Sequence, residues 1–175
     1  MEHFIEEVVG AIPSGEQVAR LTLRLVVAMF VGALIGLQRE TTRKAAGLRT
    51  HMLVSLGTAL FVVAVHEALY HEDAMSRVIQ GIITGIGFLG AGAILKLTEQ
   101  KKIRGLTTAA GIWMTAAGGV AAGLGQFVPA IVGAALAWFV LSTLWRIEHK
   151  MGWSHHPRHE GDRTDLPGDD MEDDD

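Results

Sequence analysis

The sequence predicts an all-α fold, a polytopic membrane bundle of about five transmembrane helices. The chain has 175 residues, of which 49% are apolar and only 19% are charged, and its mean hydropathy is +0.30. Four mostly apolar stretches contain no Asp, Glu, Lys or Arg, namely residues 25–37, 50–66, 78–95 and 105–145. A spanning helix needs about 20 residues to cross a hydrocarbon core of about 30 Å. These lengths therefore predict that lipid surrounds the chain.

Each stretch accounts for one or two crossings. The first is short, but its helical pattern begins near Val18, and Arg20 and Arg24 can extend their charged ends to the headgroups. The second reaches full length by including residues 67–70, and the third is long enough alone. The fourth would extend about 62 Å as one helix. Its residues 123–129 include two glycines and Pro129, so we expect a turn there and two crossings.

A soluble helical bundle with a very apolar core is the main alternative. The uncharged segment 105–145 argues against it, because neither half has the polar face that a surface helix needs. A cleaved signal peptide is also disfavoured, because the residues before Leu25 are acidic and no small-residue cleavage site precedes Gln38. The chain has no cysteine, which excludes disulfides, thiolate metal sites and a cysteine nucleophile.

The distribution of basic residues predicts the topology. Twelve of the 15 Lys and Arg residues fall in the first loop, the third loop and the C-terminal flank and tail, and three fall on the opposite side. The positive-inside rule then places the N-terminus outside and the C-terminus in the cytoplasm. We expect a periplasmic segment at residues 1–17, a transmembrane domain at 18–147 and a cytoplasmic tail at 148–175.

Glycine is frequent, with 21 residues, and it recurs with other small residues at four-residue spacing. Small residues let helix backbones approach closely in lipid. Packing within one chain is the plainer interpretation, and contact with another subunit or partner is the alternative. The predicted packing positions are Gly32, Gly36, Gly81, Gly85, Gly87, Gly90, Gly92 and Gly111.

Residues 85–90 also match the dinucleotide pattern G-x-G-x-x-G. That pattern works in a turn between a strand and a helix, with an acidic residue about 20 positions later. Here it lies inside an uncharged helical run, and residues 107–114 contain no acid. We therefore expect no nucleotide binding, and no other feature predicts a nucleic-acid partner.

A group of polar residues forms the candidate functional cluster, most of it near the cytoplasmic boundary. It comprises Arg39, Glu40, Arg49, Thr50, Gln80, Thr84, Thr107 and Thr108. Plainer interpretations exist: Thr107 or Thr108 could cap a helix, and the arginines could only set topology. The sharper hypothesis is an ion pair between Glu40 and one of these arginines. His51 and His66 flank the second run, where we expect them at the membrane interface.

The sequence predicts no metal site and no cofactor. No carboxylate lies in a predicted mid-span, although ion-coupled transporters commonly place one there. The tail contains His149, His155, His156 and His159, followed by Asp169, Asp170, Glu172, Asp173, Asp174 and Asp175. Such a mixture could bind divalent cations weakly. A solvated, disordered tail is the favoured interpretation, because apolar residues are sparse and like charges repel.

Four ordered blocks resemble the membrane domain of the MgtC/SapB family. They are residues 32–40 (GALIGLQRE), 46–51 (AGLRTH), 80–92 (QGIITGIGFLGAG) and 105–110 (GLTTAA) with Trp113. The resemblance covers about residues 20–145. It implies a bacterial inner-membrane protein of about five helices that is linked to magnesium homeostasis and, in some members, to survival inside host cells. Regulation of other membrane proteins is the commoner view of the best-known member.

Two departures from the family pattern matter. MgtC-like members carry a soluble C-terminal domain, whereas this chain has a short acidic tail and looks SapB-like. The first block has Gln38 where an acidic residue is expected. We therefore predict an accessory or regulatory protein in magnesium or phosphate homeostasis that acts on a membrane-protein partner in the bilayer, with a homo-oligomer left open. Direct transport of Mg²⁺ or another cation is the alternative, and no motif points to an enzyme.

Overall fold

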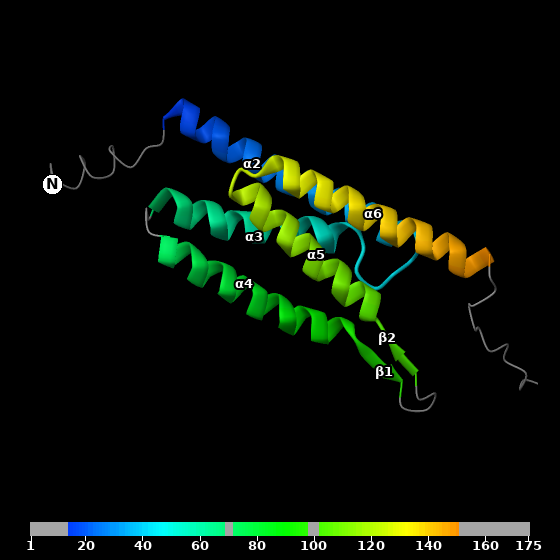
Figure 1. Cartoon of the computed structure of the whole chain (residues 1–175). Coiled ribbons are helices and arrows are strands. Elements are labelled where there is room, and N and C mark those ends of the chain that lie inside the picture. The colour runs from blue at the N-terminus through cyan, green and yellow to red at the C-terminus, as the bar shows by residue number, and fades with distance from the viewer. Residues whose placement is uncertain (1–13, 69–71, 98–101, 151–175) are drawn as a thin grey trace, which may run out of the picture. The chain divides into compact units, whose positions relative to one another are not determined.

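The computed structural model describes residues 14–68, 72–97 and 102–150. These residues form five helices and two short strands (Figure 1). In chain order they are α2 (Gly15–Thr41), α3 (Leu48–Ala68), α4 (Glu72–Ala93), β1 (Leu95–Leu97), β2 (Lys102–Arg104), α5 (Leu106–Gly123) and α6 (Phe127–Lys150). Helices α2, α3, α4 and α6 are long and apolar enough to cross a membrane. The predicted all-α class with five helices is confirmed.

Helix α2 begins earlier than the sequence pattern predicted. Ser14 is its N-cap: the Ser14 hydroxyl accepts a hydrogen bond from the Gln17 backbone N–H, and the Gln17 side chain accepts one from the Ser14 N–H. This reciprocal capping box satisfies two amides at the helix start. Glu16 and Arg20, one turn apart, add an exposed ion pair.

The turn predicted in the long uncharged run is confirmed. Helix α5 ends at Gly123, and α6 begins at Phe127. Gly125 has a φ of +78°, which L side chains rarely adopt. Arg24 of α2 donates a hydrogen bond from Nη1 to the Gly123 carbonyl at 3.2 Å, which satisfies an acceptor at the end of α5.

A small hairpin, absent from the sequence prediction, joins α4 to α5. Helix α4 ends at Ala93 rather than Leu95. Strand β1 then pairs antiparallel with β2, with Leu95 opposite Arg104 and Leu97 opposite Lys102. Gly105, with a φ of +96°, turns the chain from β2 into α5.

Glycines bring α2, α3 and α5 into backbone contact. A Cβ atom on Gly32 would lie 2.6 Å from the His51 carbonyl oxygen, and one on Gly36 would lie 2.8 Å from the Leu48 Cα. A Cβ on Gly119 would overlap the Ser55 carbonyl. These spaces are too small for any side chain, so glycine sets how closely the three helices approach.

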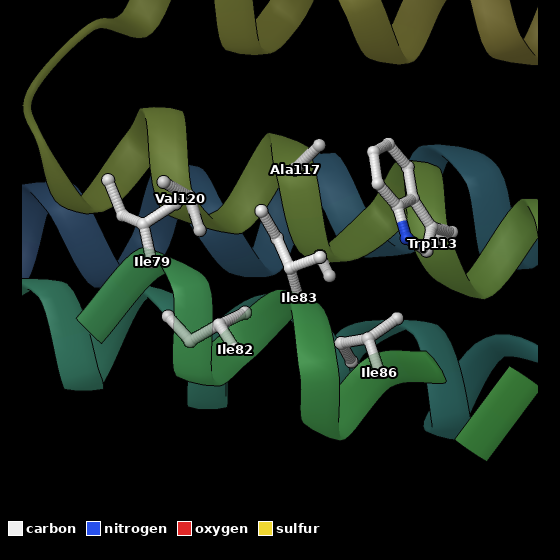
Figure 2. Close-up of a pocket in the computed structure, with 8 residues that line it drawn as sticks. Ile79, Ile82, Ile83, Ile86, Trp113, Ala117 and Val120 are labelled. Carbon is white, nitrogen blue, oxygen red and sulfur yellow. The ribbon is translucent and has the colours of Figure 1, made fainter. Parts of the chain in front are cut away.

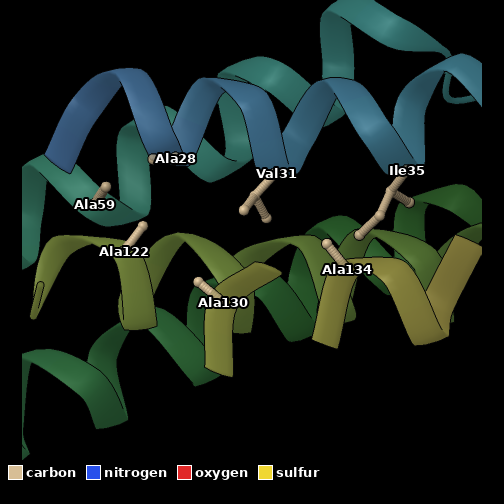
Figure 3. Close-up of a cluster of buried hydrophobic side chains, with 7 residues drawn as sticks. All are labelled: Ala28, Val31, Ile35, Ala59, Ala122, Ala130 and Ala134. Carbon is tan, nitrogen blue, oxygen red and sulfur yellow. The ribbon is translucent and has the colours of Figure 1, made fainter. Parts of the chain in front are cut away.

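The apolar core lies beside these contacts, between α2, α3, α5 and α6. Figure 3 shows α2 facing the small side chains of α5 and α6, with a single contribution from α3. Its members are Ala28, Val31, Ile35, Ala59, Ala122, Ala130 and Ala134. Because five of the seven are alanines, the core is thin and the helices pack at close range.

The chain divides into two compact units, residues 1–142 and 143–175. The first contains α2 to α5 and α6 as far as Ser142. In the second, the described residues 143–150 form the last two turns of α6. The predicted periplasmic segment up to residue 13 and the predicted tail from residue 151 lie outside the described residues.

Helix α4 corrects part of the glycine prediction. A Cβ on any of Gly81, Gly85, Gly87 or Gly92 would meet nothing within 4 Å, and one on Gly90 would meet only the Ala109 Cβ, at 3.7 Å. The predicted packing of Gly81, Gly85, Gly87 and Gly92 against helices of the same chain is therefore wrong. The reason is that α4 presents isoleucines to α5 instead. Contact of these glycines with another chain stays a prediction.

The isoleucines face α5 across a narrow gap. Ile79, Ile82, Ile83 and Ile86 of α4 line a cavity of about 160 Å³ together with Trp113, Ala117 and Val120 of α5. In Figure 2, Ile79 and Ile83 point toward α5. Gly81 and Gly85 lie on an adjacent side of α4. There they help to line a second apolar cavity of about 450 Å³ that also involves Thr58 and Phe61 of α3.

Paired substitutions test this division between tight and open glycines. Gly119→Ala should lower the free energy of unfolding by about 1–3 kcal/mol, because the added methyl group overlaps α3. Gly85→Ala should be neutral or stabilising by up to about 1 kcal/mol, because it fills open space and favours helix. Detergent-titrated unfolding measures both, and equal losses would contradict the packing described.

Candidate functional site

Seven polar side chains are buried among the described residues. They are Gln38, Arg39, His51, Ser55, Thr58, Thr108 and Thr115. All but Gln38 lie at the interface of α2, α3 and α5. We call these six residues the polar seam. Polar and ionisable groups inside a membrane bundle are costly and commonly mark function, so the seam is the candidate site.

Arg39 and Thr108 form one end of the seam. Arg39, near the end of α2, is 2% exposed, and its Nη2 donates a hydrogen bond to Thr108 Oγ1 at 3.0 Å. Its Nε is buried without a partner. The guanidinium is therefore buried inside the bundle, whereas an arginine that only sets membrane topology would lie at the surface.

Neither threonine caps α5. The N-cap residue is Gly105, which has no side-chain cap hydrogen bond. Thr107 is exposed, and Thr108, the third residue of the helix, accepts from Arg39 instead. The capping interpretation of these threonines is wrong because the left-handed turn at Gly105 starts the helix earlier.

The Glu40 side chain caps the N-terminal end of α3. Its Oε2 accepts a hydrogen bond from the Leu48 backbone N–H at 2.9 Å, and a Cβ on Gly47 would overlap this carboxylate. A carboxylate at a helix N-terminus satisfies a free amide and favours the helix dipole. The expected ion pair of Glu40 with Arg39 or Arg49 is not formed. Arg49 and its neighbour Thr50 are exposed on the first turn of α3.

His51 is fully buried, and its expected position at the membrane interface stays a prediction. Its Nδ1 lies 2.8 Å from the Gly47 carbonyl oxygen. Because a carbonyl only accepts, we assign the proton of the neutral ring to Nδ1, which leaves a lone pair on Nε2. Nε2 has no partner and faces Gly111, whose Cβ would lie 3.4 Å away.

Hydroxyl groups continue the seam along the contact between α3 and α5. Thr58 Oγ1 lies 3.0 Å from the Ser55 carbonyl and 3.3 Å from the Ala116 carbonyl, so its one O–H is shared between two helices. Thr115 donates to the Gly111 carbonyl at 2.8 Å. Ser55, fully buried, has an Oγ without a partner. The seam thus reaches from Arg39 well into the bundle.

The remaining predicted site residues lie elsewhere. Gln80 and Thr84 are exposed on α4, where the Thr84 hydroxyl donates to the Gln80 carbonyl at 3.0 Å. Gln38, which the sequence analysis noted only as a departure from a family pattern, donates from Nε2 to the Leu141 carbonyl of α6 at 3.0 Å. The structure therefore brings Arg39 and Thr108 together and leaves Gln80 and Thr84 apart from them.

Sequence reasoning missed His51, Ser55, Thr58 and Thr115 as members of the site. A signal was available, because residues 51, 55 and 58 follow the i, i+4, i+7 spacing of one helix face inside an apolar run. Ser and Thr are common in membrane helices, so a single one does not indicate a site. Their position on one helix face with a histidine is the informative feature.

The seam combines one fixed positive charge, a basic ring nitrogen and hydroxyl groups. Such a set donates and accepts hydrogen bonds, and its guanidinium opposes the entry of a cation. Among the described residues, no group of three or more His, Cys, Asp or Glu side chains could hold a metal ion. The histidines and carboxylates at residues 155–175 lie outside the described residues.

Comparison with known proteins identifies relatives that match the part of the chain containing the seam. The profile of the MgtC family matches residues 25–150, which include the whole seam. Protein SrpB of Synechococcus elongatus is 39% identical over 153 residues, which cover 81% of this chain and 83% of SrpB. No solved structure matches the chain.

Two further relatives match over less of their length. Protein MgtC of Salmonella typhimurium is 45% identical over 109 residues, 62% of this chain and 46% of MgtC. The "Putative magnesium transporter YhiD" of Escherichia coli is 35% identical over 140 residues, 76% of this chain and 64% of YhiD. The chain thus spans about half the length of MgtC. Since the family profile and SrpB both cover most of it, the chain belongs to the MgtC family of multi-pass membrane proteins.

Proposed function

We propose that the protein is an accessory or regulatory component of magnesium or phosphate homeostasis in the bacterial inner membrane. It acts on a membrane-protein partner through helix packing, and it is not itself an enzyme. The link to magnesium rests on the family and on the printed name of one relative, "Putative magnesium transporter YhiD".

The observation that carries the regulatory role is the buried guanidinium of Arg39. Mg²⁺ binds through oxygen ligands and gives up its water shell reluctantly, so a pathway for it needs carboxylates or carbonyls free to coordinate. The polar seam instead contains a fixed positive charge at one end. The hydroxyls of Thr58 and Thr115 are directed to backbone carbonyls within the bundle. This arrangement favours holding the helices in one geometry over passing a divalent cation.

The open side of α4 supports a role that depends on a partner. Gly81, Gly85 and Gly92 leave space beyond their Cα atoms, and Phe88 is 82% exposed. In lipid, small residues at four-residue spacing favour close contact with another helix. A transmembrane helix of a partner protein could therefore approach the α4 backbone here without displacing any side chain of this chain.

Direct transport of Mg²⁺ or another cation is the second candidate, favoured by the name of the Escherichia coli relative. Gln80 and Thr84 would then line the pathway, with Arg39, Glu40 and Arg49 at a hydrated vestibule. Both α4 residues are exposed in the single chain, so such a pathway would form only between copies or with a partner.

Magnesium flux separates the two candidates. Liposomes that contain the purified protein and a Mg²⁺ dye should show no influx above protein-free liposomes, because the seam offers a guanidinium in place of cation ligands. Flux that Thr84→Val removes would instead establish transport. Ser142→Ala is the matched control, since the Ser142 hydroxyl makes a similar local bond to the Phe139 carbonyl on α6.

The partner surface is tested by growth in low magnesium. In a strain that lacks the gene, wild type should restore growth and Gly85→Leu should not, because the leucine blocks the open side of α4. Gly57→Leu is the control, since Gly57 of α3 is equally free of neighbours. Full activity of folded Gly85→Leu protein would remove the α4 surface from the mechanism.

We propose the topology from the positive-inside rule, with the C-terminus in the cytoplasm and the N-terminus outside. The twelve-to-three distribution of basic residues supports it. A reporter enzyme that folds only in the cytoplasm should be active when fused after Asp175. Activity of an exclusively periplasmic reporter at the same position would reverse the orientation.

A further inference from the structure

The ring of His51 carries a hydrogen-bond acceptor that nothing in the described structure uses. The Gly47 carbonyl occupies Nδ1, so the neutral ring presents a bare lone pair at Nε2. The ring is 0% exposed and Nε2 has no partner. Native proteins rarely leave a buried polar atom unpaired, and such an atom calls for a ligand or a function.

The space at Nε2 restricts what can bind there. Nε2 faces the backbone of Gly111, where even a methyl group would lie 3.4 Å away. Helix α2 packs against the same residue, with Gly32 on the His51 carbonyl and Gly36 on its Cβ. A metal ion or an anion would need the helices to separate, whereas a proton adds no volume.

The charged groups near the His51 ring determine how its protonation would affect the helix contact. On α2, Arg39 interacts electrostatically with His51, and Glu40 is exposed and bonded to the Leu48 amide. On α3 itself, Arg49 is exposed. Helix α5 contains no charged residue between Leu106 and Gly123. A protonated ring would therefore place a second positive charge near the guanidinium of Arg39, with no carboxylate against it.

We propose that Nε2 of His51 is a proton-binding site of the membrane domain, and that its occupancy loosens the contact of the first turns of α3 with α2 and α5. A hydronium ion transfers its proton to the Nε2 lone pair: an N–H bond forms, one O–H bond breaks and leaves water, and the ring gains one positive charge. The resulting repulsion, little screened inside the bundle, acts across the contact that Gly32, Gly36 and Gly111 hold closed.

The position of His51 gives the proton access. His51 is the fourth residue of α3 and lies about 4.5 Å along the axis from Leu48. Opening of this first turn, which depends on the Glu40 cap at Leu48, would bring water to the ring. The inference does not rest on the proposed function, since a regulator or a transporter could each use such a site.

Nitrogen NMR of the full chain in lipid nanodiscs tests the site directly. With ring-¹⁵N histidine, the signals absent from His51→Gln should show a bare Nε2 and a protonated Nδ1 at neutral pH. On acidification both nitrogens should become protonated. Gly111→Ala, which places a methyl group beside Nε2, should shift the same signals and so identify them if His51→Gln fails to fold. A ring protonated at Nε2 at neutral pH, or one unchanged until the protein unfolds, overturns the proposal.

Hydrogen exchange tests the coupling. Measured relative to the intrinsic exchange rate at each pH, the protection of the amides of residues 51–55 should fall several-fold on acidification in wild type, and not in His51→Gln. Arg39→Gln, which removes the neighbouring charge and keeps a donor for Thr108, should weaken this response. Equal acid-induced loss of protection in all three proteins would separate protonation from helix contact and refute the coupling.

Discussion

Close backbone approach of α2, α3 and α5 is the constraint on which the rest of the structure depends. Lipid provides no hydrophobic drive between helices, so their association relies on packing and on hydrogen bonds between them. Gly32 and Gly36 bring α2 onto the start of α3, and Gly119 brings α5 onto Ser55. At this range a threonine hydroxyl of one helix reaches a carbonyl of the next, as Thr58 reaches Ala116. Glycine spacing and polar bonding are therefore two parts of one contact.

This contact explains how the bundle holds ionisable side chains away from water. Arg39 is shielded because α5 supplies Thr108 at the point where α2 ends. His51 is shielded because Gly32, Gly36 and Gly111 surround it with backbone instead of side chains. An unpaired polar atom in such a place costs free energy that a purely structural interface would avoid. The seam therefore combines hydrogen bonds that hold the helices together with buried atoms, Nε of Arg39 and Nε2 of His51, that have no partner.

Helix α4 has a different relation to the bundle. It meets α5 through isoleucines around a cavity, and four of its glycines, Gly81, Gly85, Gly87 and Gly92, have no neighbour within 4 Å of an added Cβ. The two sides of the protein thus differ in kind: a closed, polar contact among α2, α3 and α5, and an open, apolar surface on α4. A regulatory protein with these parts could sense a condition at the seam and engage a partner at α4. Helix α5 borders both, since Gly111 faces His51 while Trp113 faces α4.

The sequence by itself determined the fold class, the five helices and the turn before α6, because uncharged length and the breakers at Gly123, Gly125 and Pro129 are local properties. It also identified Arg39 and Thr108 as notable. It could not pair them, because a hydrogen bond between residues 69 positions apart depends on how helices are placed.

Only the tertiary structure decided which glycines touch a neighbour and which histidine is buried. Gly36 and Gly85 have the same sequence spacing, yet an added Cβ would contact Leu48 at Gly36 and no atom within 4 Å at Gly85. The reason is that a helix has several faces, and the neighbouring helices pack against only one of them. His51 and His66 both flank an uncharged run, and the fold covers the first with two helices while leaving the second exposed. Burial is a property of the assembled bundle: the spacing of residues 51, 55 and 58 marks one polar helix face, but only the packing of α2 and α5 decides that this face is buried.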